Sequence, residues 1–180
     1  MFRYAVIYTF GGVYADVDTD CITPISSWNI TDCDLLVGLE NDLHFCQWAF
    51  AATARSPFMK AIIEAIVGKF ESHDGVDTSN PNFVHYHTGP AIFSQSLKES
   101  FAKILGFQNV SLSWDSRKWF NALQNRTYTA PYRICVRDYA FFNFEHVRNN
   151  YASSAEYQNW TSWTKEAHRL SAESNPKQET

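Results

Sequence analysis

The 180-residue sequence lacks several features that would place it directly in a class of protein. Its four cysteines show neither a Cys-x-x-Cys pair nor another zinc-ligand spacing, which argues against a structural zinc site. Lysine and arginine form no dense run, and the net charge is −4, so we expect no general affinity for nucleic acid or anionic membranes. No stretch is long and apolar enough to span a membrane, and the first residues do not resemble a signal peptide. Any phosphate must therefore be bound through a metal ion or through isolated cations.

The composition describes one globular domain with its own core. Hydrophobic residues make up 45% of the chain and charged residues 19%, which are ordinary values for a folded domain. We expect residues 1–170 to form the domain and the polar residues 171–180 to form a disordered tail. The four cysteines permit one or two disulfides without requiring them.

Four Asn-x-Ser/Thr sequons favour a protein of the secretory-pathway lumen. They begin at Asn29, Asn109, Asn125 and Asn159. The aromatic content is 16%, and several tryptophans stand beside polar residues, a pairing that suits contacts with sugar rings although aromatic residues more often form the core. A luminal protein would need a targeting segment, which we do not find in this sequence.

The most informative stretch runs from Gly11 to Asp18, where a glycine pair leads into a short apolar segment that ends in Asp16-Val17-Asp18. Residues i and i+2 of an extended segment point the same way, so both carboxylates can share a face while Val17 faces the core. Two neighbouring carboxylates repel each other unless a cation lies between them, and Mn²⁺ or Mg²⁺ is the natural occupant. An EF-hand loop is rejected, because Cys21 and Ser27 stand where its glycine and glutamate are needed.

Hydrophobic periodicity and turn residues predict alternating strands and helices. Residues 2–10 are ambiguous, because they have the composition of a strand while the glycine pair that follows equally suits a helix end; the family resemblance described below favours a helix. Further helices are predicted to begin at Ser56-Pro57 and at Thr88-Gly89-Pro90, the second of them closed by Gly106. Buried strands are predicted over residues 13–17, 34–39 and 134–136, with loops over 18–27 and 73–82. This alternation indicates an α/β domain.

Polar residues follow the predicted strand over residues 34–39, namely Glu40, Asn41 and Asp42. Sites in α/β proteins collect at strand ends, which makes Glu40 and Asp42 candidates for a functional role. A separate His85-x-His87 pair could present two imidazoles on one face of a strand, but the sequence offers no third ligand, and we do not predict a zinc site there.

The order of the motifs resembles glycosyltransferase family 32, and their spacing is most similar to initiation-specific α-1,6-mannosyltransferases. The resemblance begins at Arg3-Tyr4 and the Gly11 to Asp18 run and covers nearly the whole chain. It continues through these segments: Val37-Gly38-Leu39-Glu40, Phe45-Cys46-Gln47-Trp48, Ser56-Pro57-Phe58, Thr88-Gly89-Pro90, residues 134–141 and Ser162-Trp163.

This resemblance implies a GT-A fold with a Rossmann-like sheet, in which Asp16 and Asp18 hold Mn²⁺, or Mg²⁺, against the diphosphate of a nucleotide sugar. GDP-mannose is the implied donor and a glycan is the acceptor. The family retains the anomeric configuration, through either a carboxylate nucleophile or front-face attack. By the same resemblance, Arg3 reaches the donor, and Glu40 and Asp42 give electrostatic support or position the acceptor, neither of them as a covalent nucleophile. The remaining donor or acceptor contacts are expected from Gly12, Tyr14, Gln47, Trp48, Thr88, Gly89 and Trp163.

The sequence departs from the family in two places. The family's terminal His-x-x-x-Gly-Ser-Trp is replaced by Tyr157 to Trp163, with Tyr157 at the histidine and Thr161 at the glycine. A phenol is a poor metal ligand at neutral pH, so either metal affinity or turnover is reduced, or the histidine's role passes to Ser162 or Asn159.

The second departure is at the start, where Met1 aligns within the family domain, so the first strand and helix units, the base site and a membrane anchor are expected to be missing. In full-length form we expect a type II membrane protein of the Golgi or another secretory-pathway lumen. A non-catalytic remnant, or a carbohydrate-binding subunit that depends on another chain in an oligomer or complex, is the alternative.

Overall fold

The computed structural model describes residues 1–72, 80–107, 114–124, 131–142 and 147–149. Residues that the sequence singles out beyond these ranges, including Tyr157, Ser162, Trp163 and the predicted tail, lie outside the described part. Within the described ranges, no helix has the length and apolarity to cross a bilayer.

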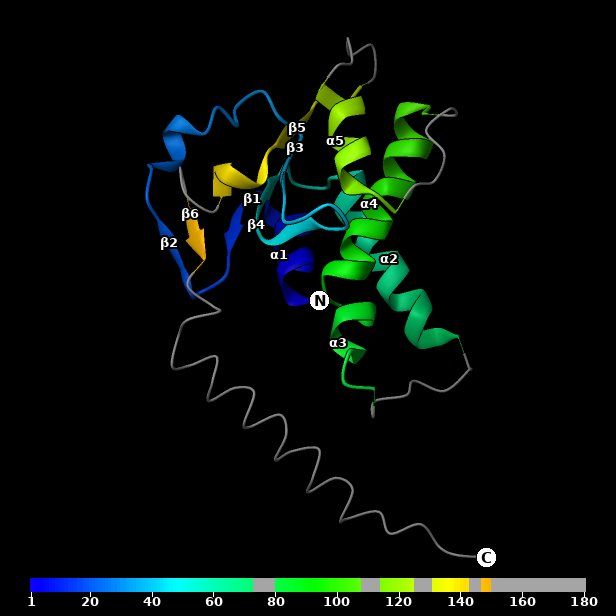
Figure 1. The fold of residues 1–180 in the computed structure, drawn as a ribbon. Helices are drawn as coiled ribbons and strands as arrows, with labels where there is room; N and C mark the ends of the chain where they lie inside the picture. Colours follow the sequence, from blue (N-terminus) through cyan, green and yellow to red (C-terminus); the bar gives the residue numbers. More distant parts are fainter. Residues whose placement is uncertain (73–79, 108–113, 125–130, 143–146, 150–180) are drawn as a thin grey trace, which may run out of the picture.

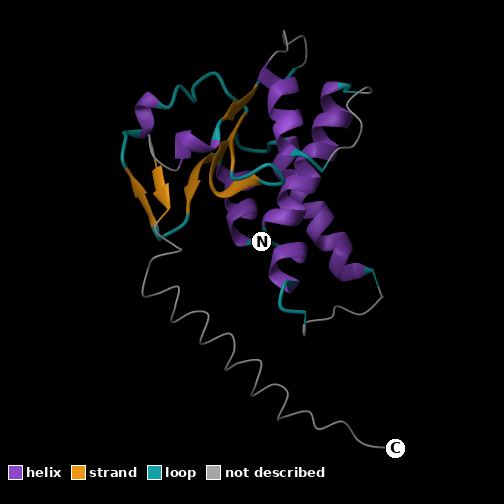
Figure 2. Ribbon diagram, in the orientation of Figure 1, coloured by secondary structure: helices purple, strands orange, loops and turns teal. Residues whose placement is uncertain are grey.

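The domain is built on a four-stranded sheet in the order β1-β4-β3-β5 (Figures 1 and 2). Its strands are β1 (Gly12–Ala15), β3 (Leu35–Leu39), β4 (Phe45–Ala52) and β5 (Ile134–Arg137). β4 runs antiparallel to both β1 and β3, whereas β3 and β5 are parallel. Two short strands, β2 (Thr19–Cys21) and β6 (Val147–Asn149), form a separate antiparallel pair. The predicted α/β class is confirmed, with a mixed rather than a purely parallel sheet.

Helices cover one face of the sheet (Figure 1). They are α1 (Phe2–Phe10), α2 (Pro57–Glu71), α3 (Phe83–His87), α4 (Pro90–Leu105) and α5 (Ser116–Gln124), and a 3₁₀ turn, η1 (Ile25–Ser27), lies apart from them. Side chains alternate along β3, so Leu35 and Val37 enter the core beneath the helices and Leu36 enters a second core with Trp28 and Phe142. Both faces of β3 are therefore buried, as expected for a short apolar run.

Local signals in the sequence explain the ends of the predicted helices. Proline occupies the first turn of α2 after Ser56 and of α4 after Gly89. α4 ends at Gly106, whose φ of 67° lies in the left-handed region that glycine adopts without strain. The favoured helix over residues 2–10 is confirmed as α1, with Tyr4 and Ile7 buried, and Gly11 ends it by donating its N–H to the carbonyl of Ile7 at 2.8 Å.

Several local predictions are wrong. The first strand ends at Ala15, and Val17 is fully exposed, because the chain turns at Asp16 to Asp18 instead of continuing into the core. The predicted loop over residues 18–27 contains β2 and η1. His85 and His87 lie on the helix α3, where residues two positions apart do not share a face.

A disulfide joins Cys33, just before β3, to Cys135 in β5. It links the two parallel strands beside their first paired residues, Leu35 and Ile134. Of the other two cysteines, Cys46 is buried and Cys21 is exposed, and both are free thiols. One of the two disulfides that the composition permits is therefore present.

Candidate functional site

The carboxylate pair lies on a turn that leaves the edge strand β1. The backbone N–H of Asp16 donates to the carbonyl of Trp48 in β4 at 2.8 Å, and the N–H of Thr19 donates to the carbonyl of Asp16 at 3.1 Å. Asp16 and Asp18 are partly buried, whereas Val17 between them is fully exposed. The predicted orientation, with Val17 in the core, is therefore wrong, and the two aspartates are the less exposed residues of the turn.

Asp16 is fixed by two side chains on neighbouring elements. Arg3 on α1 places Nη1 2.9 Å from Oδ1 of Asp16, and the Tyr14 hydroxyl donates to the same oxygen at 2.5 Å. Arg3 also donates to the carbonyl of Gln47 at 3.1 Å, and its guanidinium lies 4.9 Å from the centre of the Tyr14 ring. Charge-assisted hydrogen bonds of this kind hold a carboxylate in one orientation. We call Arg3, Tyr14 and Asp16 the Arg3 cluster.

Glu40 places a third carboxylate near this cluster. It follows β3, and its Oε2 is buried without a hydrogen-bond partner among the described residues. Burial raises the pKa of Glu40, and the negative charge of Asp16 raises it further. Glu40 is therefore close enough to Asp16 to be affected by its charge, and it carries an oxygen without a hydrogen-bond partner among the described residues.

Tyr4 contacts two residues that were predicted to bind the donor or acceptor, Gln47 and Thr88. Its hydroxyl lies 2.6 Å from Oε1 of Gln47 and 3.1 Å from the carbonyl of Thr88. The ring is fully buried against Phe93, so the hydroxyl is held from the core side. Tyr4 was not among the predicted site residues, and only its position beside Arg3 in the Arg-Tyr motif pointed to it.

The structure places other predicted residues differently. Trp48 is 7% exposed and packs its ring against Phe142, so its side chain belongs to the second core. Gly12 is exposed in the edge strand β1, with a positive φ of 102°. Gly89 is buried, and a side chain there would meet the carbonyl of Val84 at 2.7 Å, so glycine permits the close approach of α3 and α4.

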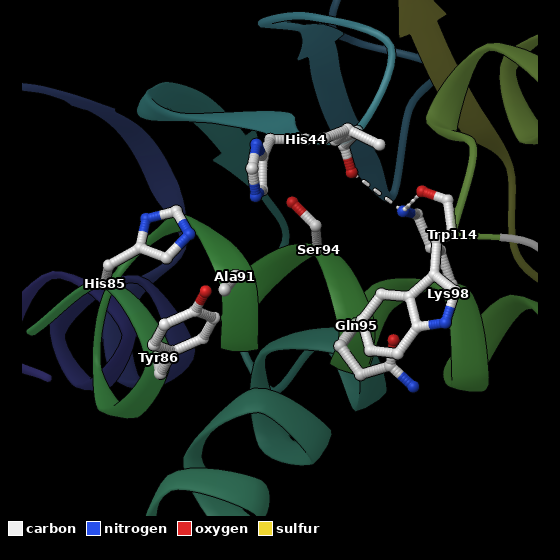
Figure 3. Close-up of a pocket in the computed structure, with 9 residues that line it drawn as sticks. His44, His85, Tyr86, Ala91, Ser94, Gln95, Lys98 and Trp114 are labelled. Atoms are coloured by element: carbon white, nitrogen blue, oxygen red, sulfur yellow. Dashed lines mark hydrogen bonds between the residues drawn. The ribbon is translucent and has the colours of Figure 1, made fainter. Parts of the chain in front are cut away.

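The two histidines of α3 point to different neighbours. The His85 ring lies edge-on to that of His44, with 5.0 Å between ring centres (Figure 3), whereas His87 stacks on Phe83 at 4.2 Å. They are not brought together as a pair of metal ligands. No zinc site was predicted from them.

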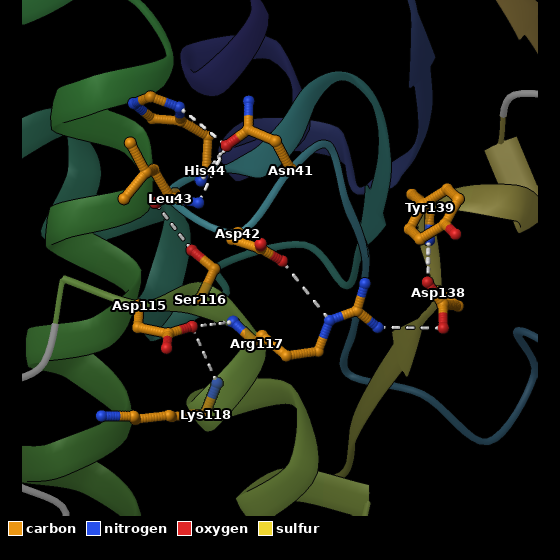
Figure 4. A network of polar contacts seen from close by, with 10 residues as sticks. All are labelled: Asn41, Asp42, Leu43, His44, Asp115, Ser116, Arg117, Lys118, Asp138 and Tyr139. Atoms are coloured by element: carbon orange, nitrogen blue, oxygen red, sulfur yellow. Dashed lines mark hydrogen bonds and ion pairs between the residues drawn. The ribbon is translucent and has the colours of Figure 1, made fainter.

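Asp42 belongs to a polar network of its own (Figure 4). Its carboxylate lies 3.6 Å from Nε of Arg117, and Arg117 also contacts Asp138 at 3.0 Å. The carbonyl of Asp42 accepts a hydrogen bond from the N–H of Ser116 at the start of α5, at 2.6 Å. These contacts tie the β3–β4 turn to α5 and β5, and they engage Asp42 away from the Arg3 cluster.

The donor set fits a divalent cation that takes most of its ligands from a substrate. Among the described residues, no group of three or more His, Cys, Asp or Glu side chains is arranged to hold a metal ion. Oδ1 of Asp16 is engaged by Arg3 and Tyr14, which leaves Oδ2, and in the described part of the chain the Asp18 carboxylate makes no hydrogen bond or ion pair. Mg²⁺ and Mn²⁺ are commonly held by one or two carboxylates together with phosphate oxygens and water.

The chain was compared with known protein families, and one family model matches its first residues. Residues 1–34, which contain the Arg3 cluster and the carboxylate turn, match the family model described as "Glycosyltransferase sugar-binding region containing DXD motif". Over these residues the chain is similar to DXD-containing glycosyltransferases, and the resemblance seen in the sequence is confirmed.

The chain is also similar to individual glycosyltransferases of three yeasts. The chain is 29% identical over 118 residues to the initiation-specific alpha-1,6-mannosyltransferase of Schizosaccharomyces pombe, a match that covers 54% of this chain and 30% of the relative. It is 25% identical over 164 residues to the Candida albicans protein of the same name, covering 71% and 40%. It is 36% identical over 72 residues to the putative glycosyltransferase HOC1 of Saccharomyces cerevisiae, covering 37% and 18%. The chain spans less than half the length of each relative.

Among solved structures, the PaToxG glycosyltransferase overlaps the fold with a TM-score of 0.47 and 20% identity, over 68% of this chain and 38% of that one.

Proposed function

We propose that this chain carries the metal and donor site of a retaining glycosyltransferase that moves mannose from GDP-mannose to a glycan acceptor. The observation that carries the proposal is the Arg3 cluster, in which Arg3 and Tyr14 hold Asp16 beside Asp18 on one turn. The names of the two mannosyltransferase relatives support the choice of sugar.

The residues of this site have different roles in the proposed reaction. Asp16 and Asp18 would hold Mn²⁺ or Mg²⁺, which when bound neutralises the negative charge that develops on the diphosphate leaving group. Arg3 and Tyr14 keep Asp16 in one orientation, so little reorganisation is needed when donor and metal arrive. Arg3 has five N–H donors, and those not used by Asp16 and Gln47 are available to a phosphate oxygen or a sugar hydroxyl.

Glu40 supplies an acceptor for a sugar hydroxyl. Its buried Oε2 has no hydrogen-bond partner among the described residues, and a hydroxyl donor from the transferred sugar would satisfy it. Binding would then replace an unfavourable buried carboxylate by a hydrogen-bonded one, which adds to the affinity for sugar over the nucleotide alone. We assign Glu40 this positioning role and do not assign it as a covalent nucleophile.

Two observations support a secretory-pathway lumen, such as the Golgi, as the place of action. The Cys33–Cys135 disulfide is the kind of bond that persists in oxidising compartments. Asn29, which begins a sequon, is exposed with a positive φ of 54°, so its side chain is accessible for glycosylation.

The test is thermal unfolding with Mn²⁺ and GDP, alone and together. At ligand concentrations of 100 times Kd, stabilisation should be about 2.7 kcal/mol, or roughly 5 to 10 °C in Tm. Asp18→Ala should remove the gain, whereas Asp32→Ala, at an exposed aspartate paired with Arg133, should keep it. The absence of any shift with Mn²⁺ and GDP in the unmodified chain would overturn the proposal.

Transfer is measured separately, with GDP-mannose and a mannose-containing oligosaccharide. Formation of a new glycosidic bond supports the full proposal. Binding of Mn²⁺ and GDP without transfer favours the alternative of a non-catalytic remnant, whereas a carbohydrate-binding subunit that needs another segment for nucleotide binding would show neither.

A further inference from the structure

A cavity lies beside the turn between β3 and β4 (Figure 3). Its volume is about 370 Å³, within the range of about 300 to 1,000 Å³ that is typical of small-molecule sites. The lining residues come from this turn, from α3 and α4, and from the residue two positions before α5: Leu43, His44, His85, Tyr86, Ala91, Ser94, Gln95, Lys98 and Trp114. We call it the His44 cavity.

Lys98 gives this cavity a fixed positive charge. The residue is 3% exposed, and its Nζ donates to the carbonyls of Leu43 at 2.8 Å and Trp114 at 2.5 Å. An ammonium has three N–H donors, so these two carbonyls leave one for a ligand as far as the described residues are concerned. Burial lowers the pKa of Lys98 to about 8, partly offset by Asp115, so the group remains mostly protonated at neutral pH. No carboxylate is among the nine lining residues.

The two imidazoles of the cavity add hydrogen-bonding groups of a different kind. The His44 ring is edge-on to that of His85, and its Nδ1 lies 3.2 Å from Oδ1 of Asn41. Burial, together with the charges of His85 and Lys98, lowers the pKa of His44. With Nδ1–H donating to Asn41, the neutral ring has an acceptor nitrogen at Nε2, which suits a sugar hydroxyl. The side chain of Gln95 adds both a donor and an acceptor.

Two exposed aromatic side chains form walls of the same cavity. Trp114 is 69% exposed and Tyr86 is 50% exposed, although large aromatic side chains gain most from burial. Aromatic rings beside hydrogen-bonding groups match the two characters of a sugar, which has apolar C–H faces and polar hydroxyl edges. A small inorganic anion would leave both walls uncovered.

We propose that the His44 cavity binds an anionic sugar residue, a hexose that carries a phosphate or carboxylate group, with Lys98 contacting the anion and Tyr86 and Trp114 the ring faces. The site is separate from the Arg3 cluster but connected to it, because the N–H of Glu40 donates to the carbonyl of His44 at 3.0 Å within one turn. If the proposed transferase function holds, the cavity is an acceptor subsite, and this assignment alone rests on that function.

The proposal is tested by isothermal titration of the full chain with glucose 6-phosphate, glucuronate, glucose and inorganic phosphate. Glucose 6-phosphate or glucuronate should bind more tightly than both glucose and phosphate, and the order of the two anionic sugars identifies the charged group. Lys98→Met should weaken that binding about 10- to 100-fold, as expected for loss of a charge-assisted hydrogen bond.

Trp114→Ala keeps the test informative if Lys98→Met does not fold, because the side chain is mostly exposed. It should weaken binding about 3- to 10-fold through loss of one aromatic wall, whereas Phe10→Ala, at another exposed aromatic residue, should leave binding unchanged. Equal binding of glucose and glucose 6-phosphate would overturn the anionic part of the inference. Equal binding of phosphate would overturn the sugar part, and no binding of either anionic sugar would overturn both.

These outcomes are distinct from those of the proposed function. Loss of anionic-sugar binding with an intact Mn²⁺ and GDP shift refutes the cavity alone. Anionic-sugar binding that persists in Asp18→Ala, in a chain that gives no shift with Mn²⁺ and GDP, keeps the cavity and refutes the transferase proposal.

Discussion

The guanidinium of Arg3 lies 2.9 Å from Oδ1 of Asp16, and this contact joins the first helix to the turn that follows the first strand. The same Asp16 oxygen accepts a hydrogen bond from Tyr14, so one carboxylate is held from two elements. This arrangement pre-organises one half of the carboxylate pair before any ligand is present.

Replacing Arg3 by alanine should weaken the binding of Mn²⁺ with GDP about tenfold, because Asp16 loses its fixed orientation and the phosphates lose a cation. Arg3→Lys should recover only part of this, since a lysine ammonium lacks the planar, delocalised guanidinium that lies over the Tyr14 ring. The unliganded Tm should change little, because partly exposed ion pairs contribute about 0 to 1 kcal/mol. Unchanged affinity in a Tm titration with GDP would contradict the assignment of Arg3.

Tyr14→Phe removes the second hydrogen bond to Asp16 and should change stability at alkaline pH. Burial and the hydrogen bond to Asp16 raise the pKa of Tyr14 to about 12. Because this folded-state pKa exceeds the unfolded value of 10.0, the contribution to stability is full below pH 10 and is lost as the pH rises towards 12. The variant should therefore lose less stability than the unmodified chain between pH 10 and 12.

Urea unfolding at several pH values, with absorbance at the tyrosinate band, measures this difference. Tyr139→Phe, at an exposed tyrosine in the Arg117 network, is the matched control. An identical pH dependence for Tyr14→Phe and the unmodified chain would show that Tyr14 does not titrate as described.

Glu40→Gln should stabilise the unliganded protein at neutral pH and reduce its affinity for the sugar part of the donor. Burial, and then Asp16, raise the pKa of Glu40 above 4.5, so the folded state favours the protonated form. This favourable contribution is complete below pH 4.5 and is lost as the pH rises through the folded-state pKa, which leaves a buried carboxylate oxygen with no hydrogen-bond partner in the described part of the chain. Glutamine avoids that cost, about 1 kcal/mol.

The free energy of unfolding should therefore differ between Glu40→Gln and the unmodified chain at pH 7.5 and converge near pH 4. Comparison of GDP with GDP-mannose then separates the sugar contact from nucleotide binding. A variant that is less stable at pH 7.5 would indicate that the charged carboxylate has a stabilising partner in the native state.

Cys33→Ser with Cys135→Ser should lower the free energy of unfolding by about 2 to 5 kcal/mol. The disulfide closes a loop with a sequence separation of 102 residues, and long loops lose the most unfolded-state entropy when they are closed. Chemical denaturation with and without reductant measures the effect. Cys21→Ser, at an exposed free cysteine, should have no comparable effect.

Local signals in the sequence predicted much of the framework. The caps at Ser56-Pro57 and Gly106, and the apolar run of β3, depend on near neighbours, and each was located correctly. Strand β4 escaped prediction, because its sequence FCQWAFAA includes three alanines, which are weak strand formers, and its stability comes from pairing with strands on both sides.

In the candidate site, too, long-range contacts could not be predicted from local signals in the sequence. The prediction that Val17 faces the core between Asp16 and Asp18 was wrong, because β1 ends at Ala15 and the chain turns there. The contacts of Tyr4 with Gln47 and Thr88 span 43 and 84 residues of sequence, and only the fold brings them together.

The Cys33–Cys135 bond makes a closed covalent ring of the segment between the two cysteines, which contains α2 to α5 and every lining residue of the His44 cavity. The Arg3 cluster stands outside that ring, on the chain before Cys33. A single proteolytic cut anywhere within the ring would leave two fragments that migrate as one species until reductant is added. Limited digestion followed by electrophoresis with and without reductant would thus distinguish a cut between Cys33 and Cys135 from a cut in the segment before Cys33, which carries Asp16.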